Sequence, residues 1–294
     1  MPNSTPKLPL NPSLLTSPPL FVGSSLFDSH CHFDFAAFEQ YKDQQTTLWQ
    51  QCQQIGIQQM LIPGVQAKQW HRVQALSEQL EGVYFACGLH PWFLDLSRQA
   101  DDANTADDLS KLAIQLQHPK CVAIGECGID GSITATHPIA LQQKIFVSQL
   151  KIAQALQRPM IIHAHRAHHI LQPLLKRYPL SAGGVIHAFS GSLELAQSYL
   201  KLGFKLGIGG TITYPRAKKT QNTVAQLPLS CLLLETDAPD MPLYGSQGQR
   251  NSPLRLPDVA RALQQLRQGA GKKESLDEIY RQTTDNARAL FQLI

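Results

Sequence analysis

Histidines and carboxylates recur at the ends of short apolar runs, where a protein can direct several metal ligands to one point. The first run ends in DSHCHFD. Side chains alternate between the two faces of a strand, so His30 and His32 should project to the same side. Neutral imidazole is a common ligand for divalent metals, but structural histidines are commoner than ligands. The pair therefore predicts a metal site only if other donors join it.

Three later runs add such donors. Glu126 follows an apolar stretch in AIGECGID, and burying an unpaired carboxylate there would be costly. Its charge therefore needs a partner. That partner could be a cation, and the two oxygens of a glutamate can bridge two adjacent ions. It could instead be an arginine in a structural salt bridge. The fifth run, MIIHAH, delivers His163, and the sixth, VIHAFSG, delivers His187.

The eighth run, LLLETDAP, ends in Asp237, and Glu235 lies two positions earlier on the same face. We expect Asp237 nearest the mouth of the site, with Glu235 layered beneath it. Four histidines and two carboxylates at five strand ends fit one or two cations such as Zn, Mn or Mg. The candidate ligands are His30, His32, Glu126, His163, His187 and Asp237.

Eight strand-like runs alternate with segments of helical periodicity, which implies parallel strands and crossover helices. The runs begin at positions 26, 59, 83, 121, 159, 183, 204 and 231. Helices are expected over 39–55, 68–80, 138–156, 167–177 and 193–202, and near 257–267 and 276–293. Only a closed barrel makes strands one, four, five, six and eight converge, whereas an open doubly wound sheet would not. We therefore predict an α/β fold, a TIM-type (β/α)8 barrel.

Composition excludes fibrous and membrane-spanning classes for this chain of 294 residues, of which 43% are hydrophobic and 16% charged. Six cysteines without a CxxC pair indicate reduced thiols and a cytoplasmic protein. The net charge of +4 tolerates an anionic substrate without requiring one. Residues 1–24 are rich in proline and predict an extended or disordered arm, dispensable for folding, before a single domain over 25–294.

Several ordered motifs resemble those of the TatD family of metal-dependent deoxyribonucleases, from about Leu26 to the C-terminus. These motifs are DSHCHFD, GLHP, IGECGID, IIHAH, GVIHAFSGS, GGTITYPRA, LLLETDAPDMP and TTDNARALF. The resemblance implies a barrel of the metal-dependent hydrolase kind, phosphodiester chemistry and two divalent metals that share Glu126. One metal would be held by His30, His32, Glu126 and Asp237, and the other by Glu126, His163 and His187.

Further residues are candidates for substrate binding. His90 in GLHP resembles a family position beside the substrate, although a histidine before proline can also simply cap a strand. Where the family typically reads His-x-Arg, this sequence has His163, Ala164 and His165. His165 would then face a substrate phosphate with fewer donors than arginine, unless Arg166 compensates, or it would pack against the loop.

A basic run around Arg216 follows the seventh strand-like run. Such a run is usually a solvated surface, but at this end of the barrel it could meet a nucleic-acid backbone. We count Arg216 among the candidate substrate-binding residues.

The leading hypothesis is a deoxyribonuclease, expected to be an exonuclease acting on single-stranded DNA as a monomer. The metals would polarise the phosphate and activate water, while Asp237 orients the water and accepts its proton, with Glu126 as the second catalytic residue. Two alternatives remain open. One is a metal-dependent deacylase or amidohydrolase acting on an ester or amide such as an aminoacyl-RNA, and the other is a metal-binding protein without catalysis.

Overall fold

The computed structural model describes residues 23–38, 44–95 and 103–293. The arm expected over 1–24 lies outside these residues, apart from Gly23 and Ser24. Ser24 donates its backbone N–H to the Asp277 carboxylate at 2.9 Å, which connects the start of the described chain to its last helix.

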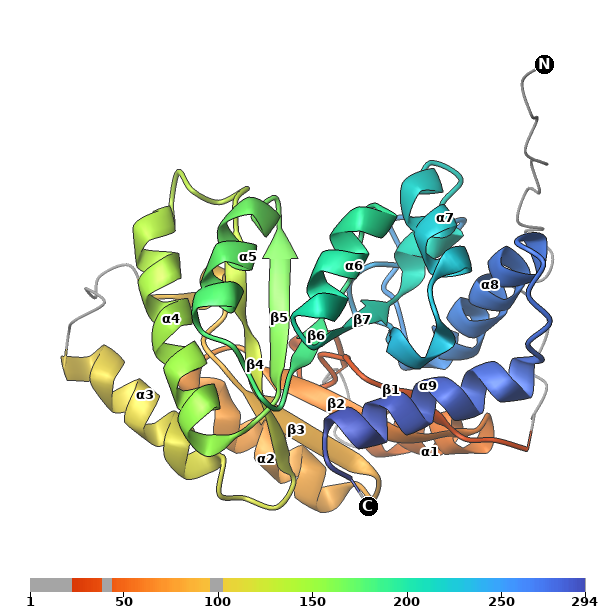
Figure 1. Cartoon of the computed structure of the whole chain (residues 1–294). Coiled ribbons are helices and arrows are strands. Elements are labelled where there is room, and N and C mark those ends of the chain that lie inside the picture. The colour runs from red at the N-terminus through yellow and green to blue at the C-terminus, as the bar shows by residue number, and fades with distance from the viewer. Residues whose placement is uncertain (1–22, 39–43, 96–102, 294) are drawn as a thin grey trace.

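Eight parallel strands form one sheet in sequence order, β1 to β8 (Figure 1). They are β1 (Leu26–Asp28), β2 (Ile57–Gly64), β3 (Val83–Cys87), β4 (Cys121–Asp130), β5 (Met160–His165), β6 (Gly184–Ile186), β7 (Phe204–Ile208) and β8 (Leu232–Leu234). The last strand meets the first just beyond their ends, where Ser29 N–H donates to the Leu234 carbonyl at 3.0 Å. The nearly closed arrangement confirms the predicted barrel.

Helices surround the strands, and two of them were not predicted from the sequence. The described helices are α1 (Gln44–Gln54), α2 (Trp70–Gln79), α3 (Ala103–Gln115), α4 (Ile139–Leu156), α5 (His168–Arg177), α6 (Leu193–Lys201), α7 (Lys218–Gln226), α8 (Leu256–Gly269) and α9 (Leu276–Leu290). The unpredicted pair is α3 and α7. Within the described chain, no helix is both long and apolar enough to cross a membrane.

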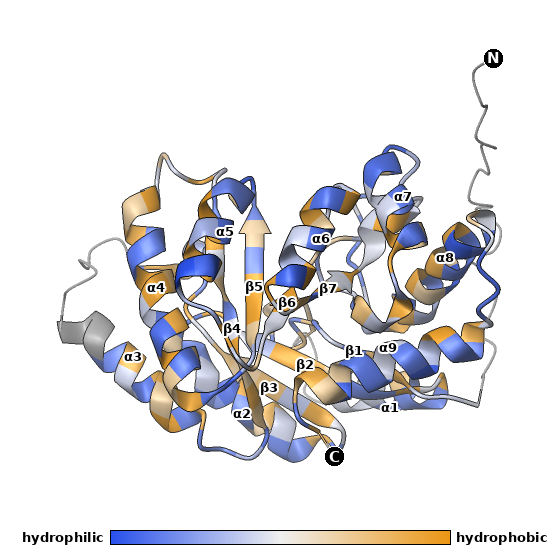
Figure 2. Cartoon of the chain, in the orientation of Figure 1, coloured by the Kyte–Doolittle hydropathy of each residue, from blue (hydrophilic) through white to orange (hydrophobic). Residues whose placement is uncertain are grey.

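Alternation along the strands separates two layers of apolar side chains. Met60 and Ile62 of β2 belong to the large cluster that includes the surrounding helices, whereas Leu61 between them belongs to a second cluster. This second cluster also holds Ile161 of β5 and Phe291, just after α9. Figure 2 shows β2, β3 and β5 as mainly hydrophobic, whereas α4 and α9 carry both hydrophobic and hydrophilic residues.

Candidate metal centre

Three candidate ligands follow residues of the second apolar cluster at even spacings in the sequence. Ile161 of that cluster is followed two positions later by His163, and Val185 is followed by His187. Leu233 leads, in two steps of two, to Asp237. Residues two apart share one face of a strand. This rule covers His163 within β5, whereas His187 and Asp237 lie just beyond the ends of β6 and β8, and Asp237 has a φ of 55°.

The other three candidates depend on irregular backbone. Strand β1 ends at Asp28, so His30 and His32 lie in the segment after it rather than in a strand. Their rings nevertheless project to the same side, with Nε2 atoms 3.3 Å apart. Glu126 lies at a register shift between β4 and β5, which breaks simple alternation along β4. All six predicted side chains come together despite these irregularities.

The first group of donor atoms has the dimensions of a small coordination shell. Glu126 Oε2 lies 3.2 Å from His30 Nε2 and 3.4 Å from His32 Nε2. Asp237 Oδ1 lies 3.5 and 3.6 Å from the same two nitrogens. Ligands about 2.1 Å from a tetrahedral cation stand about 3.4 Å apart. The measured spacing therefore fits one divalent cation.

The second group surrounds the other oxygen of the same carboxylate. Glu126 Oε1 lies 2.8 Å from His187 Nε2, 3.1 Å from His163 Nδ1 and 3.2 Å from His90 Nε2. His163 Nδ1 and His187 Nε2 are 3.3 Å apart. Each Glu126 oxygen thus faces its own set of nitrogens.

Burial and the Glu126 carboxylate act in opposite directions on the protonation of the candidate ligands. Burial raises the pKa of Glu126, but the surrounding histidines, His187 first, outweigh burial and hold that pKa well below its usual value. Burial, reinforced by His187, lowers the pKa of His30 to about 3. His30 is therefore neutral and keeps a lone pair for a metal. Glu126 acts in the opposite direction on His187 and, against burial, raises the pKa of that ring to about 10, so a cation bound there would displace a proton.

A second carboxylate, Asp130, was not singled out in the sequence. Its Oδ2 lies 3.0 Å from His163 Nε2, which leaves His163 Nδ1 free to face Glu126. Outer carboxylates commonly fix the tautomer and orientation of a ligating histidine in this way. Asp130 follows Glu126 by four residues on β4, and this spacing was the signal that could have identified it.

Glu235 lies beneath the candidate ligands, as expected. It is fully buried, and Oε1 lies 3.9 Å from His187 Nδ1 and accepts the Ala188 backbone N–H. Burial raises the pKa of Glu235 to about 8. A Cβ at Gly207 would stand 2.1 Å from Glu235 Oε2. Only glycine at that position leaves room for the carboxylate.

His90 caps a short helix and contacts Glu126, while its expected role beside the substrate stays a prediction. Its Nδ1 accepts the backbone N–H of Trp92 at 3.2 Å and so caps the short 3-10 helix Pro91–Phe93. Burial lowers the pKa of His90 to about 4, so the ring is neutral. Because Nδ1 accepts a hydrogen bond, Nε2 carries the proton and donates to Glu126 Oε1.

The remaining candidates lie farther out. His165 is exposed at the end of β5, and its ring centroid is 6.5 Å from that of His163. Arg166, the next residue, is exposed with a φ of 50°. Arg216 is also exposed, and its guanidinium carbon lies 5.2 Å from the centroid of the Tyr214 ring. These three side chains are outside the group of closely interacting donors.

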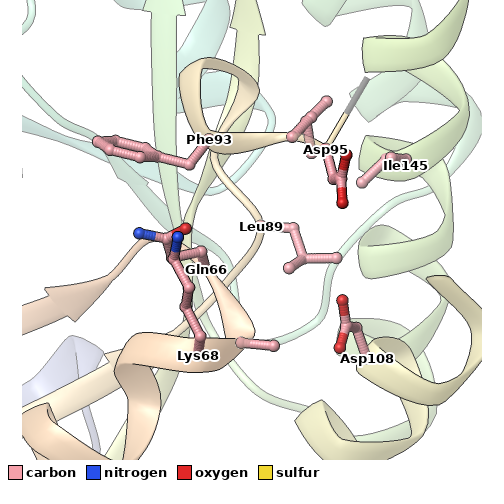
Figure 3. Close-up of a pocket in the computed structure, with 9 residues that line it drawn as sticks. Gln66, Lys68, Leu89, Phe93, Asp95, Asp108 and Ile145 are labelled. Carbon is pink, nitrogen blue, oxygen red and sulfur yellow. The ribbon is translucent and has the colours of Figure 1, made fainter. Parts of the chain in front are cut away.

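A cavity of about 320 Å³ opens beside the cluster (Figure 3). Leu89 and Phe93, which flank His90 in sequence, belong to its lining. None of the six candidate ligands lines it. The cavity is therefore a neighbour of the cluster and is not the place where the donor atoms converge.

The chain is similar to a known protein family and to several of its members. The family model described as TatD related DNase matches residues 27–292. An uncharacterized metal-dependent hydrolase, YjjV of Escherichia coli K12, is 41% identical over 267 residues, covering 90% of this chain and 97% of the relative. The crystal structure of YjjV, a TatD homologue, superimposes with a TM-score of 0.81 at 39% identity, covering 92% of this chain and 98% of that one. The 3'-5' ssDNA/RNA exonuclease TatD of Erwinia amylovora is 33% identical over 252 residues, covering 82% and 91%.

Proposed function

Since this chain belongs to the TatD-related DNase family of metal-dependent hydrolases, we propose that it is a deoxyribonuclease that removes nucleotides from single-stranded DNA. The relative named as a single-strand exonuclease supports the choice of substrate. A nucleic acid would then be its principal partner. All six candidate ligands come from one chain, which is consistent with a monomer as the active unit.

The observation that carries the proposal is the position of Glu126 between two donor groups. Its Oε2 faces His30 and His32, and its Oε1 faces the second set of imidazoles. A carboxylate shared in this way suits two cations held a few ångströms apart, an arrangement that recurs in enzymes that displace groups at phosphorus. We assign His30, His32, Glu126 and Asp237 to one ion and Glu126, His163 and His187 to the other.

Bound Mg, Mn or Zn would polarise the scissile phosphate and lower the pKa of a water molecule. Asp237 would orient the attacking water and accept its proton, because its Oδ1 belongs to the first donor group and its side chain is 12% exposed, open toward the mouth. His90 would hold Glu126 in place through its Nε2 proton. Phosphates farther along the DNA strand would contact three exposed side chains by charge or by hydrogen bonds. These are His165, Arg166 and Arg216.

A nuclease assay tests the proposal. Metal-stripped protein should not degrade end-labelled single-stranded DNA, and added Mn, Mg or Zn should restore stepwise release of nucleotides. Duplex DNA of the same sequence should react more slowly. Release of an acyl group from aminoacyl-RNA or a simple amide, with no attack on DNA, would favour the deacylase alternative. Stoichiometric metal binding without either activity would favour a binding protein.

A further inference from the structure

Exposed aromatic side chains stand beside the cluster in the segment that follows β3. Trp92 is 56% exposed and Phe93 is 41% exposed. Two other exposed apolar residues, Ile114 and Leu156, lie near the C-terminal ends of α3 and α4, away from the carboxyl ends of the strands. Adjacent exposed rings at a functional end of a barrel indicate a binding surface rather than an ordinary exposed side chain.

Trp92 is held in place by the same atom that orients a candidate ligand. Its Nε1–H donates to Asp130 Oδ2 at 2.7 Å, and this oxygen is also 3.0 Å from His163 Nε2. The indole is therefore anchored at its edge while its surface remains open to solvent. One oxygen atom, Asp130 Oδ2, therefore contacts both the exposed Trp92 ring and His163.

Two phenylalanines extend this surface along the cluster. Phe35 stacks on His32, with ring centroids 4.4 Å apart and planes at 19°. Phe93 lies edge-on to Phe35 at 6.4 Å and to His90 at 5.7 Å. We call Phe35, Trp92 and Phe93 the aromatic rim.

We propose that the aromatic rim binds an unpaired nucleobase by stacking, with Trp92 as the main platform. The inference rests on the proposed function and deepens it. A base is separated from its own phosphate by one sugar, so a phosphate at the donor cluster brings a neighbouring base to the adjacent rim. Every base has a π-face, so stacking accepts any sequence. A duplex hides those faces, and the rim therefore selects single strands.

Fluorescence gives a direct test because Trp49 and Trp70 are each only 2% exposed. The probe is an oligothymidylate of roughly 10 nucleotides, within the usual range of single-strand sites. It carries phosphorothioate linkages, so that binding to the metal-loaded protein is measured while hydrolysis is suppressed. We expect it to quench the fluorescence of the wild-type protein, and we expect the quenching to disappear in Trp92→Phe. An abasic oligomer of equal length should not quench.

Affinity is measured by anisotropy of a labelled probe. Trp92→Ala should weaken oligothymidylate binding roughly 5- to 150-fold and leave the abasic oligomer unaffected. Trp92→Phe keeps a stacking ring but loses the hydrogen bond to Asp130, and should bind like wild type. Phe93→Ala is a second variant expected to weaken binding, and Ile114→Ala is the remote control that should not.

The outcomes separate this inference from the nuclease proposal. Equal losses for both probes in Trp92→Ala, or no loss for either, would overturn the aromatic rim as a base platform. Quenching and base-dependent affinity without DNA hydrolysis would support the rim and reject the deoxyribonuclease. If Trp92→Ala hydrolyses DNA with an unchanged KM, the deoxyribonuclease is supported and the aromatic rim is rejected.

Discussion

At the scale of single residues, the candidate centre consists of a few groups that have no comparable role elsewhere in the fold. Glu126 is the clearest example, because it is 2% exposed and is contacted through both of its oxygens. Burying a carboxylate is unfavourable unless positive charge or strong donors compensate. A pair of cations would provide that compensation. Without them, the surrounding imidazoles must serve as donors.

Replacing Glu126 with glutamine should lower metal content and activity together. The amide keeps the shape but loses the charge and one acceptor, so both donor groups should weaken. We expect kcat to fall at least about 100-fold, since even outer partners of a metal site contribute about 10- to 100-fold. Metal analysis after gel filtration and a nuclease assay measure the two effects. Glu78→Gln is the matched control, because Glu78 also contacts a histidine, His118, but is exposed.

Replacing Asp130 with asparagine should act through His163. The amide can no longer fix the His163 tautomer as a carboxylate does, so metal affinity or activity should fall about 10- to 100-fold. Metal titration followed by calorimetry gives the affinity. Asp107→Asn removes a carboxylate from an exposed pair with Lys111 and should change neither property. Wild-type affinity in Asp130→Asn would show that the contact is incidental.

At the scale of elements, regular alternation was predictable and departures from it were not. Side chains two positions apart on β5 point to the same face, so His163 lies above Ile161, and the sequence alone is sufficient for that inference. The end of β1 before His30 was not foreseen, nor was the register shift at Glu126. Such irregularities depend on tertiary pairing with neighbouring strands, which leaves no local signature.

The two missed helices have a related explanation. Helix α7 reads KKTQNTVAQ and buries Thr220 and Thr223 beside Val224 and Ala225. Threonines inside a helix face weaken the apolar periodicity on which sequence prediction depends. The basic residues before and within α7 suggested a surface segment instead. Helix α3 has apolar residues with helical spacing, including Leu109 and Leu112, but its surroundings are strongly polar.

Strand β7 gives a prediction about packing. In Gly207→Ala the new methyl group would meet Glu235 Oε2, so Glu235 must move or the strands must separate. We expect a loss of about 1–3 kcal/mol in the free energy of unfolding, typical of overpacked cores. Thermal and denaturant unfolding measure it. In a Glu235→Ala background, Gly207→Ala should lower the free energy of unfolding by less than it does in the wild-type background. If the effects of the two substitutions on the free energy of unfolding simply add, the contact between the two positions is contradicted.

At the scale of the whole molecule, nearly every contact that holds the barrel among the described residues lies from residue 25 onward. Ser25 accepts a hydrogen bond from the Thr284 hydroxyl at 2.8 Å, and Leu26 is completely buried. Ser24 adds the single backbone contact with Asp277. The described structure therefore starts to pack against α9 at the point where the proline-rich segment ends.

A chain beginning at Ser25 should fold as well as the full chain. Among the residues that the structure describes, it loses one partly buried hydrogen bond, at Ser24, so we expect a change of about 1 kcal/mol or less in the free energy of unfolding. Circular dichroism during heating measures this. A chain beginning at Phe27 is the matched control, because it also loses Leu26 and the Ser25 carbonyl. Insolubility of the chain that begins at Ser25 would show that the arm takes part in folding.

The contact between the two ends of the barrel also has a consequence during protein synthesis. Asp237 donates its backbone N–H to the His30 carbonyl at 2.9 Å, so residues 207 positions apart complete the first donor group together. A ribosome adds only about 5–20 residues per second, and the early strands emerge well before Asp237 does. A nascent chain consequently has no complete first donor group until its eighth strand has left the exit tunnel. A hydrolase built in this way has no complete set of candidate metal ligands while it is still being made.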